Sequence, residues 1–590
     1  MSHSRIPPPR SSISSQHQAA GAASSQTDDT VGADAERFYP PPPNNLPLLQ
    51  TFVGRERELA LLRDQFPAGT LAIVGADGVG KSSLALEFAR RFIHDFKLVW
   101  WVRGEAPEFI EEDLLSLAIL LNLNQGTIQE QRARLEDFFH RNTHWLLVVD
   151  DASTPQEIRP LLPKSGSGRV LVTSSREASW DGMVDTLCLL TPLSPEEGVS
   201  SLAWRMGREA GPDEVSLVHE LQNNPLAIAM AGACLSNAAC CTDELLQAVR
   251  HRKKQDETAW ERLGHYALAC LAKISPLGVG ALEMLVFFAS GIPLPVLVSG
   301  RGKFPRISGH LPSTAESWRH VVEMLVKLGL IEVQDDVVYV HARIRFLVQS
   351  TLSLHQQRLR AEAALRLIDD HFDWRWDASD AWRHPGHLAP LAAVTAQRAD
   401  VWGVEAETIA LVLNQAGSFY HGLENFHRAT DLLRRAMTLV ENNYGPVHPA
   451  IASCANNLGA VLEDMGDLRG SKELLERALR IDELCYGAFH PNVAINASNL
   501  AVVLLNLGET DRAVELFKRA LRIHATHKGE NHPDLACHFH NLGQVYLRME
   551  TWNLARETLQ RAVAAYRAGL GPEHPDTRLC QEHLAEIPSL

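Results

Sequence analysis

The sequence lacks the cysteine spacing that builds metal and redox sites, and it has little positive charge. Its 590 residues include nine scattered cysteines, and no two of them form a Cys-x-x-Cys pair. A zinc site or redox motif is therefore not expected, and scattered free thiols are typical of the reducing cytoplasm. The 56 lysines and arginines are outnumbered by 71 aspartates and glutamates, which gives a net charge of −15. This balance disfavours direct binding of nucleic acid.

Long apolar runs are missing as well. No uninterrupted apolar stretch approaches the length that spans a bilayer, and the first residues lack the apolar core of a signal peptide. We therefore expect a soluble, cytoplasmic protein with no membrane span. Residues 1–50 are rich in serine, proline and alanine and cannot bury enough apolar surface to fold alone. They are expected to be a disordered leader with no room for an effector or DNA-binding domain.

The C-terminal third contains a dipeptide at a fixed interval. The steps between its copies are equal, since 490−448 = 532−490 = 574−532 = 42, and the copies are His448-Pro449, His490-Pro491, His532-Pro533 and His574-Pro575. A period of this length is typical of stacked helix pairs. The pattern resembles the tetratricopeptide repeat in its longer, kinesin-light-chain-like form, over about residues 406–580. We expect residues 406–590 to form an all-α solenoid that recognises a protein or peptide.

Two columns of polar residues recur in these repeats. The histidines are poor metal ligands, because a single ligand in each repeat has no second ligand nearby; proline opens a helix, and the histidine fills the turn before it. Asparagines at the same interval form the second column, at Asn457, Asn499 and Asn541. On the concave side of the solenoid, their amides would hydrogen-bond a peptide backbone. An internal helix-to-helix hydrogen bond explains the column equally well.

The N-terminal half alternates short apolar runs with helical segments. The runs lie at residues 71–74, 97–102, 145–151 and 169–175, and this alternation predicts a parallel sheet covered by helices on both faces. We assign residues 51–190 to a nucleotide-binding domain of the P-loop α/β class. The segments that follow predict a helical lid domain over 191–266, a winged-helix domain with a short hairpin over 267–352, and a helical linker over 353–405.

The strongest chemical motif is GADGVGKS at residues 75–82, which fits the pattern G-x-x-x-x-G-K-[ST]. It lies between a predicted strand and a predicted helix, where backbone N–H groups and the helix N-terminus point at phosphate oxygens. Lys81 would reach the β- and γ-phosphates of ATP or ADP, and Ser82 would ligate Mg²⁺. The expected phosphate-binding residues are Gly75, Gly78, Val79, Gly80, Lys81, Ser82 and Ser83.

Acidic residues follow at the end of the third apolar run. Asp150 would hold Mg²⁺, since a carboxylate at the carboxyl edge of a parallel sheet emerges beside the phosphates. Asp151 is placed to orient or deprotonate the attacking water. Arg176, just after the fourth run, could place a guanidinium on the γ-phosphate. These residues predict a slow, regulatory Mg²⁺-dependent ATPase.

Several segments, taken in order, resemble a known family. FVGRE at residues 52–56, the phosphate loop, LLVVDD, VLVTSSR and NPLA at 224–227 are similar to the NB-ARC module of the signal-transducing ATPases with numerous domains, the class of plant resistance proteins and apoptosome-forming activators. The resemblance covers about residues 50–350. It implies that Val53 and Arg55 contact the nucleotide, that Pro225 packs on the adenine, and that His341 touches the β-phosphate of ADP. A packing or capping role is the alternative for His341.

Together these features predict an ATP/ADP-controlled signalling switch. It would sense a partner through its repeats and form a homo-oligomer when ATP is bound, and the resemblance implies a role in defence or cell death. A repeat adaptor with a vestigial nucleotide site is the first alternative. The second is a transcriptional regulator of the same ATPase class that acts through a partner.

Overall fold

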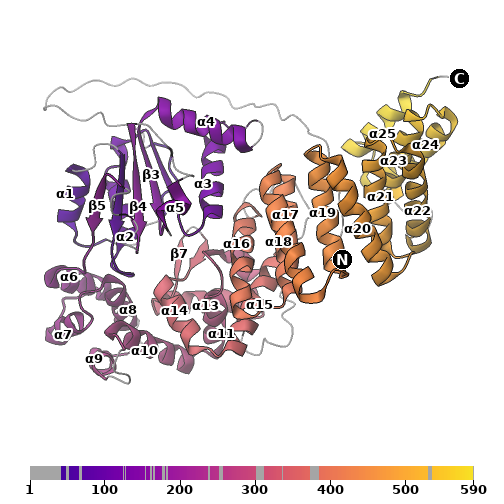
Figure 1. Ribbon diagram of the computed structural model, residues 1–590. Helices are drawn as coiled ribbons and strands as arrows, with labels where there is room; N and C mark the ends of the chain where they lie inside the picture. Colours follow the sequence, from indigo (N-terminus) through magenta and orange to yellow (C-terminus); the bar gives the residue numbers. More distant parts are fainter. Residues whose placement is uncertain are drawn as a thin grey trace. The chain divides into compact units, whose positions relative to one another are not determined.

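The chain folds into two compact units, shown in Figure 1. The boundary between the described parts of the two units lies between Val404 and Glu405. The computed structural model describes residues 42–47, 52–64, 69–123, 125, 128–152, 154–159, 163, 167–175, 180, 184–236, 240–251, 257–299, 311–334, 336–371, 385–528 and 535–588.

The first unit begins with a five-stranded parallel sheet in the order β2-β3-β4-β1-β5. The strands are β1 (Gly69–Val74), β2 (Leu98–Arg103), β3 (Thr143–Asp150), β4 (Ser167–Ser174) and β5 (Thr186–Leu189). Four of them coincide with the apolar runs of the sequence, so the α/β class is confirmed. The fifth strand, β5, was not predicted.

Helices cover both faces of this sheet (Figure 1). Successive strand residues point to opposite faces, so Leu71 and Ile73 pack under α1 (Glu56–Asp64) and α2 (Lys81–Arg91). Ala72 and Val74 belong to the apolar cluster of the other face, which includes side chains of α3 (Pro107–Leu120) and α4 (Ile128–Arg141). Burial on both faces explains why the strands are apolar throughout rather than alternating. Short segments η1 (Ile93–Asp95) and α5 (Pro155–Ile158) complete this part.

A run of helices follows, as the sequence predicted. These are α6 (Pro195–Met206), α7 (Pro212–Glu220), α8 (Pro225–Ser236), α9 (Thr242–Arg250) and α10 (Ala259–Ile274). The start of α6 is fixed by a capping box, in which Ser194 accepts from the N–H of Glu197 and the Glu197 carboxylate accepts from the N–H of Ser194.

The last part of the first unit combines helices with a small antiparallel sheet. Its strands are β6 (Ile292–Pro293), β7 (Glu332–Gln334) and β8 (Val337–Tyr339), in the order β6-β8-β7. The hairpin β7-β8 lies between two helices, as expected for a winged helix, and β6 adds a third strand. The helices are α11 (Pro276–Leu285), α12 (Leu294–Val298), α13 (Ala315–Lys327), α14 (Ala342–Thr351), α15 (Leu354–His371) and α16 (Pro385–Ala399), followed by η4 (Asp400–Trp402).

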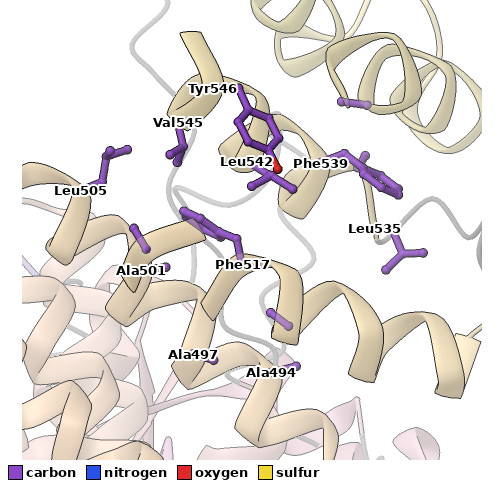
Figure 2. Packing of buried hydrophobic residues seen from close by; sticks show 14 of the residues in the cluster. Ala494, Ala497, Ala501, Leu505, Phe517, Leu535, Phe539, Leu542, Val545 and Tyr546 are labelled. Carbon is purple, nitrogen blue, oxygen red and sulfur yellow. The ribbon is translucent and has the colours of Figure 1, made fainter. Parts of the chain in front are cut away.

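The second unit is entirely helical in its described residues, which confirms the predicted all-α solenoid. Its helices are α17 (Ala406–Gly422), α18 (Phe426–Tyr444), α19 (Pro449–Asp464), α20 (Leu468–Tyr486), α21 (Pro491–Asn506), α22 (Thr510–Lys528), α23 (Ala536–Arg548), α24 (Trp552–Leu570) and α25 (Pro575–Ala585). Consecutive helices pack against one another, and buried apolar side chains of α20 to α25 belong to one continuous cluster. Figure 2 shows Phe517 of α22 among buried side chains of α21 and α23.

Small residues let the two helices of each pair approach closely. They recur at the interval of the repeat, since 459−417 = 501−459 = 543−501 = 42, at Gly417, Gly459, Ala501 and Gly543. A Cβ on Gly459 would lie 2.8 Å from Cγ of Leu475, and one on Gly543 would lie 2.6 Å from Cδ2 of Leu559. In the pair whose small residue is Ala501, the position equivalent to these leucines is Phe517.

The repeated histidines cap helices. His448, His490 and His574 are the N-cap residues of α19, α21 and α25, and in each the Nδ1 atom accepts from the N–H two residues later. The proline that follows occupies the first helical position, where its missing N–H costs nothing. His532-Pro533 lies outside the described residues. The structure thus supplies the physical reason for the repeated dipeptide.

Candidate functional site

The phosphate loop connects β1 to α2 at the carboxyl edge of the sheet. A Cβ on Gly75 would lie 2.4 Å from the carbonyl oxygen of Leu190, so this position requires glycine. Gly78 and Gly80 have φ angles of 78° and 93°, which L residues rarely adopt. The buried side chain of Val79 anchors the loop in the apolar core under α2. The loop therefore has the backbone shape that a phosphate cradle needs.

Helix α2 presents its N-terminus at this loop. Its first intrahelical bond runs from the N–H of Leu84 to the carbonyl of Gly80, at 2.9 Å. The N–H groups of Lys81, Ser82 and Ser83 therefore have no acceptor within the helix, and the side chains of Ser82 and Ser83 are exposed. Such N–H groups, together with the helix dipole, favour an anion.

Lys81 lies folded over the loop. Its Nζ donates to the carbonyls of Gly75 and Ala76 at 3.0 and 3.2 Å and lies 3.7 Å from Oδ1 of Asp77. Burial lowers the pKa of the ammonium, and the charges of Asp77, Asp151 and Asp150 oppose that change. A lysine held by carbonyls in this way can exchange them for phosphate oxygens, which are better partners for a positive charge.

Asp150 and Ser82 come together as a metal site requires. Oγ1 of Thr173 donates to Oδ1 of Asp150 at 2.6 Å, and the Ser82 hydroxyl is close enough to act on the pKa of the Asp150 carboxyl. Burial raises that pKa to about 6, although Thr173 and Ser82 lower it. Among the described residues, no three His, Cys, Asp or Glu side chains converge on one point. Mg²⁺ fits here nevertheless, because it is usually held by one or two protein oxygens with phosphates and water.

Asp151 follows in a strained backbone conformation. Its φ angle is 54°, and its N–H donates to Oγ1 of Thr173 at 2.9 Å. Burial raises the pKa of this carboxyl, and Lys81 acts in the opposite direction. The conformation aims Asp151 differently from Asp150, so the two neighbours can perform different tasks. Arg176, the proposed γ-phosphate sensor, lies outside the described residues.

Arg55 is held by the protein itself. It is only 4% exposed, and its Nη2 donates to the carbonyls of Val79 and Thr191 at 3.2 and 2.6 Å. Its N–H donates to the Glu197 carboxylate at 2.7 Å. Arg55 thus connects the phosphate loop to α6 and to the segment that precedes it, while Val53 is half-buried in the same entry segment. Nucleotide contact by these two residues stays a prediction.

The structure brings Pro225 and His341 to the same loop. A Cβ on Gly80 would lie 3.8 Å from Cγ of Pro225, and the N–H of Leu226 donates to the Gly78 carbonyl at 3.2 Å. His341 is the N-cap of α14, and its Nδ1 accepts from the N–H of Arg343 at 3.2 Å. His341 as a whole residue is exposed, yet desolvation by the surrounding protein lowers the pKa of its ring to about 4, with Asp77 and Lys81 among the charges that act on it.

Sequence reasoning missed four residues at this edge of the sheet: Thr173, Glu105, Arg345 and Arg398. Thr173 holds both aspartates in place. The charges of Arg345 and Arg398 act on Asp151 and on Glu105. Arg345 lies one helical turn after His341 on α14, a spacing that could have been noticed. Arg398 and Glu105 carry no local signal, because only the tertiary fold brings them together.

The asparagine column takes part in internal hydrogen bonds. Nδ2 of Asn457 donates to Oδ1 of Asn414 at 3.0 Å and to Oγ of Ser418 at 3.1 Å. Nδ2 of Asn499 donates to Oδ1 of Asn456 at 2.9 Å. These bonds link the first helix of one repeat to the first helix of the next. They are the internal helix-to-helix hydrogen bonds that the sequence analysis gave as an alternative. All three asparagines are half-buried, and peptide binding by their remaining polar atoms stays a prediction.

Comparison with known proteins identifies the repeats. A family model of the tetratricopeptide repeat matches residues 408–483, 455–526 and 534–587. The Regulatory protein AfsR of Streptomyces griseus is 30% identical over 203 residues, which are 32% of this chain and 20% of AfsR. The Disease resistance protein LAZ5 of Arabidopsis thaliana is 25% identical over 199 residues, which are 30% of this chain and 17% of LAZ5. The chain therefore spans about a fifth of the length of these relatives.

A solved structure is similar along most of the chain. It is a signal transduction ATPase with numerous domains that has a tetratricopeptide repeat sensor, from Pyrococcus horikoshii, at 15% identity and a TM-score of 0.37 over 91% of this chain and 86% of the other. The match to a disease resistance protein agrees with the resemblance to the ATPase class that includes the plant resistance proteins. No helix in the described part of the chain is long and apolar enough to cross a membrane.

Proposed function

We propose that this chain, whose residues 408–526 and 534–587 match tetratricopeptide repeats and whose first unit resembles the signal-transducing ATPases, is a nucleotide-controlled signalling switch. The first unit would bind ATP or ADP with Mg²⁺, and the repeats would bind a protein or peptide partner. ATP would favour self-association and slow hydrolysis would reset the chain. A role in defence or cell death is part of the proposal, and direct binding of nucleic acid is not.

One observation supports this proposal above the others. The loop of Gly75–Gly80, the Lys81 ammonium, the Ser82 hydroxyl and the Asp150 carboxylate lie together at one sheet edge. When Mg²⁺ is bound it neutralises phosphate charge. The loop N–H groups and Lys81 would orient the phosphates, Ser82 and Asp150 would hold the metal, and Asp151 would position or accept the proton of a water. This arrangement favours a working nucleotide site over a vestigial one, because a site that no longer binds nucleotide does not require the loop, Lys81, Ser82 and Asp150 to lie together.

Nucleotide titration tests the site directly. Lys81→Ala should weaken binding of a fluorescent ATP or ADP roughly 100-fold or more, since charge-assisted hydrogen bonds are worth about 1.5–3 kcal/mol each. Lys97→Ala is the matched control, because Lys97 is an exposed lysine of the same domain. Unchanged affinity in Lys81→Ala would remove the phosphate-loop assignment and favour the alternative of a repeat adaptor with a vestigial site.

The transcriptional alternative makes a different demand. The name of one relative, Regulatory protein AfsR, is compatible with a regulator that acts through a partner. In that case nucleotide binding would persist, and the partner recovered with the full chain would be a component of the transcription machinery. Affinity capture with wild type and Lys81→Ala, followed by mass spectrometry, distinguishes a nucleotide-dependent partner from a permanent one.

A further inference from the structure

Two carboxylates lie side by side where β2 and β3 end. Arg103 of β2 pairs with Asp150 of β3 in the sheet register, and the N–H of Gly104 donates to the Asp150 carbonyl at 2.6 Å. Glu105 and Asp151 follow the two strands, and the charge of Asp151 acts on Glu105. Burial raises the pKa of Glu105 to about 7.

Two arginines from different helices reach the same place. Nη1 of Arg345 on α14 and Nη1 of Arg398 on α16 both donate to the carbonyl of Ala289, at 3.0 and 3.5 Å. The N–H of Ala289 donates to Oγ1 of Thr395 at 3.1 Å, so the same residue also anchors α16. Two guanidinium groups on one carbonyl repel each other, and a neighbouring anion would relieve that repulsion.

Helix α16 is also attached to the sheet domain. Nε2 of Gln397 donates to Oε1 of Glu108 on α3 at 3.3 Å. Arg398 is the next residue. Its position relative to the strand ends is therefore fixed by two contacts of α16, that of Gln397 with Glu108 and that of Thr395 with Ala289. The cluster therefore comprises groups from the sheet edge, from α14 and from α16, all within the first unit.

The charges in this cluster are close but are not joined in pairs. Both arginines act electrostatically on Glu105 and on Asp151, yet among the described residues no ion pair within 4.0 Å connects either arginine to either carboxylate. Nε of Arg345 and Oε2 of Glu105 are buried and have no hydrogen-bond partner in the part of the chain that the structure describes. A buried donor left in this state costs free energy, which an oxyanion within its reach would recover.

The location of the cluster indicates which oxyanion this is. Asp151 lies within electrostatic reach of Lys81 as well as of the two arginines, so the cluster adjoins the lysine that closes the phosphate loop. ATP extends past the second phosphate by one group that ADP lacks. We propose that Arg345 and Arg398 bind the terminal phosphate of ATP and make the site selective for ATP over ADP.

This inference rests on the proposed nucleotide site and adds to it a discriminating pair. Guanidinium groups suit the task, because their planar N–H donors match phosphate oxygens and keep their charge when buried. Arg398 belongs to the helix that precedes the repeats in the sequence. A phosphate contact through Arg398 would therefore make the position of α16 depend on which nucleotide is bound.

Equilibrium titration of the full chain tests the pair, with ADP and with the non-hydrolysable β,γ-imido analogue of ATP. Arg345→Gln and Arg398→Gln should each weaken the analogue roughly tenfold, in line with a lost charged hydrogen bond, and should change ADP less than about twofold. Arg343→Gln is the matched control on the same helix, since its guanidinium stacks over Trp260, 5.5 Å from the ring centroid. It should leave the ratio of the two affinities unchanged.

A second measurement separates phosphate binding from a structural role. Arg398→Lys keeps the charge and should recover part of the selectivity, and hydrogen exchange of residues 385–399 should be slower with the analogue than with ADP in wild type only. Equal losses for both nucleotides, or the same loss in Arg343→Gln, would overturn the inference. A wild-type chain that binds neither nucleotide would instead refute the proposed function, so the two failures are distinguishable.

Discussion

Neighbouring carboxylates at the end of β3 have different surroundings, and this difference supports the separate roles proposed for them. Asp150 accepts a hydrogen bond from Thr173 and lies near the Ser82 hydroxyl, whereas the Asp151 carboxylate is surrounded by the charges of Lys81, Asp77 and the two arginines. A carboxylate near Ser82 is suited to hold a metal with it. A carboxylate aimed elsewhere by a positive φ angle is suited to act on a water.

Asp151→Asn should therefore separate binding from hydrolysis. The substitution keeps the size of the side chain and removes its ability to accept a proton, so ATP affinity should stay within a few-fold of wild type while hydrolysis slows about 100-fold or more. Phosphate release in single-turnover reactions measures the second quantity. Asp150→Asn serves as the comparison, because it should lower Mg²⁺-dependent binding itself.

His341 has two roles that different substitutions distinguish. Its Nδ1 caps α14, and its ring lies near the charges of Asp77 and Lys81. Asparagine is also a good N-cap, so His341→Asn should preserve stability, whereas His341→Ala should lose about 1 kcal/mol. If the ring contacts the nucleotide, both variants should release ADP faster, as stopped-flow displacement would show. Faster release in the alanine variant alone would leave capping as the only role.

His540 in α23 should make the repeats sensitive to acid. It is 6% exposed, its Nε2 lies 2.8 Å from Nδ1 of His583, and burial lowers its pKa from 6.5 to about 4. The unfolded chain takes up a proton as pH falls through about 6.5, whereas the folded chain resists until about pH 4. Stability should therefore be complete above pH 6.5 and fall towards pH 4 by up to roughly 3 kcal/mol, since one pKa unit is about 1.4 kcal/mol.

Hydrogen exchange of residues 536–548 between pH 7 and 5, corrected for intrinsic rates, measures this loss. His540→Asn should reduce the pH dependence, because asparagine does not titrate. The fold should tolerate the change, since asparagine occupies the equivalent position of an earlier repeat, Asn456. The same substitution at His427, whose side chain is 83% exposed, should have no effect. A wild-type profile that does not change with pH would contradict the expectation.

Residues with a local pattern were predictable, and residues brought together by the fold were not. The phosphate loop and Asp150 could be read because a glycine motif and an apolar strand mark them in the sequence. Glu105 and Arg345 lie far apart in the chain, so no spacing could connect them. The asparagine column was identified from the sequence, but its partners Asn414 and Asn456 were not. Each partner lies in the preceding repeat, one residue before the position equivalent to the asparagine that it bonds.

At the scale of elements, the packing of each repeat depends on a matched pair of residues. Gly459 lies against Leu475, and the equivalent pair in the next repeat is Ala501 and Phe517. A flat ring leaves room for a methyl group that a branched leucine does not. This agreement of size and shape across helices is what a period in the sequence cannot show by itself.

The short strand β5 was missed for a different reason. It has only four residues, and only one of their side chains is buried.

Gly459→Ala should destabilise the repeats by about 1–2 kcal/mol, because crowding against Leu475 exceeds the gain in helix propensity. Adding Leu475→Phe should recover part of that loss and recreate the pair of the next repeat. Thermal unfolding of the single and double variants gives the coupling energy. Gly422→Ala is the control, since a Cβ there would meet no atom of the described residues within 4 Å and helix propensity alone should make it neutral or slightly stabilising. Additive effects would show that the two positions do not interact.

For the whole molecule, the size of the phosphate effect limits what nucleotide alone can do. If Arg345 and Arg398 each contribute about tenfold to ATP affinity and contact the terminal phosphate in only one of two conformations, ATP can shift the equilibrium between them by roughly 100-fold relative to ADP. Moving a population from about 1:99 to 99:1 requires about 10,000-fold. The remaining factor must come from another ligand, and the repeats are the part of the chain suited to bind one.

We therefore expect the full chain saturated with the ATP analogue to be a mixture of assembled and unassembled molecules, and the chain with ADP to be unassembled. Light scattering after size-exclusion chromatography measures the two populations. Arg398→Gln should reduce the assembled fraction, Lys81→Ala should abolish it, and Arg343→Gln should leave it unchanged. Complete assembly of wild type with the analogue alone would mean that the nucleotide supplies the whole free-energy difference. In that case the repeats would select the partner without controlling the switch.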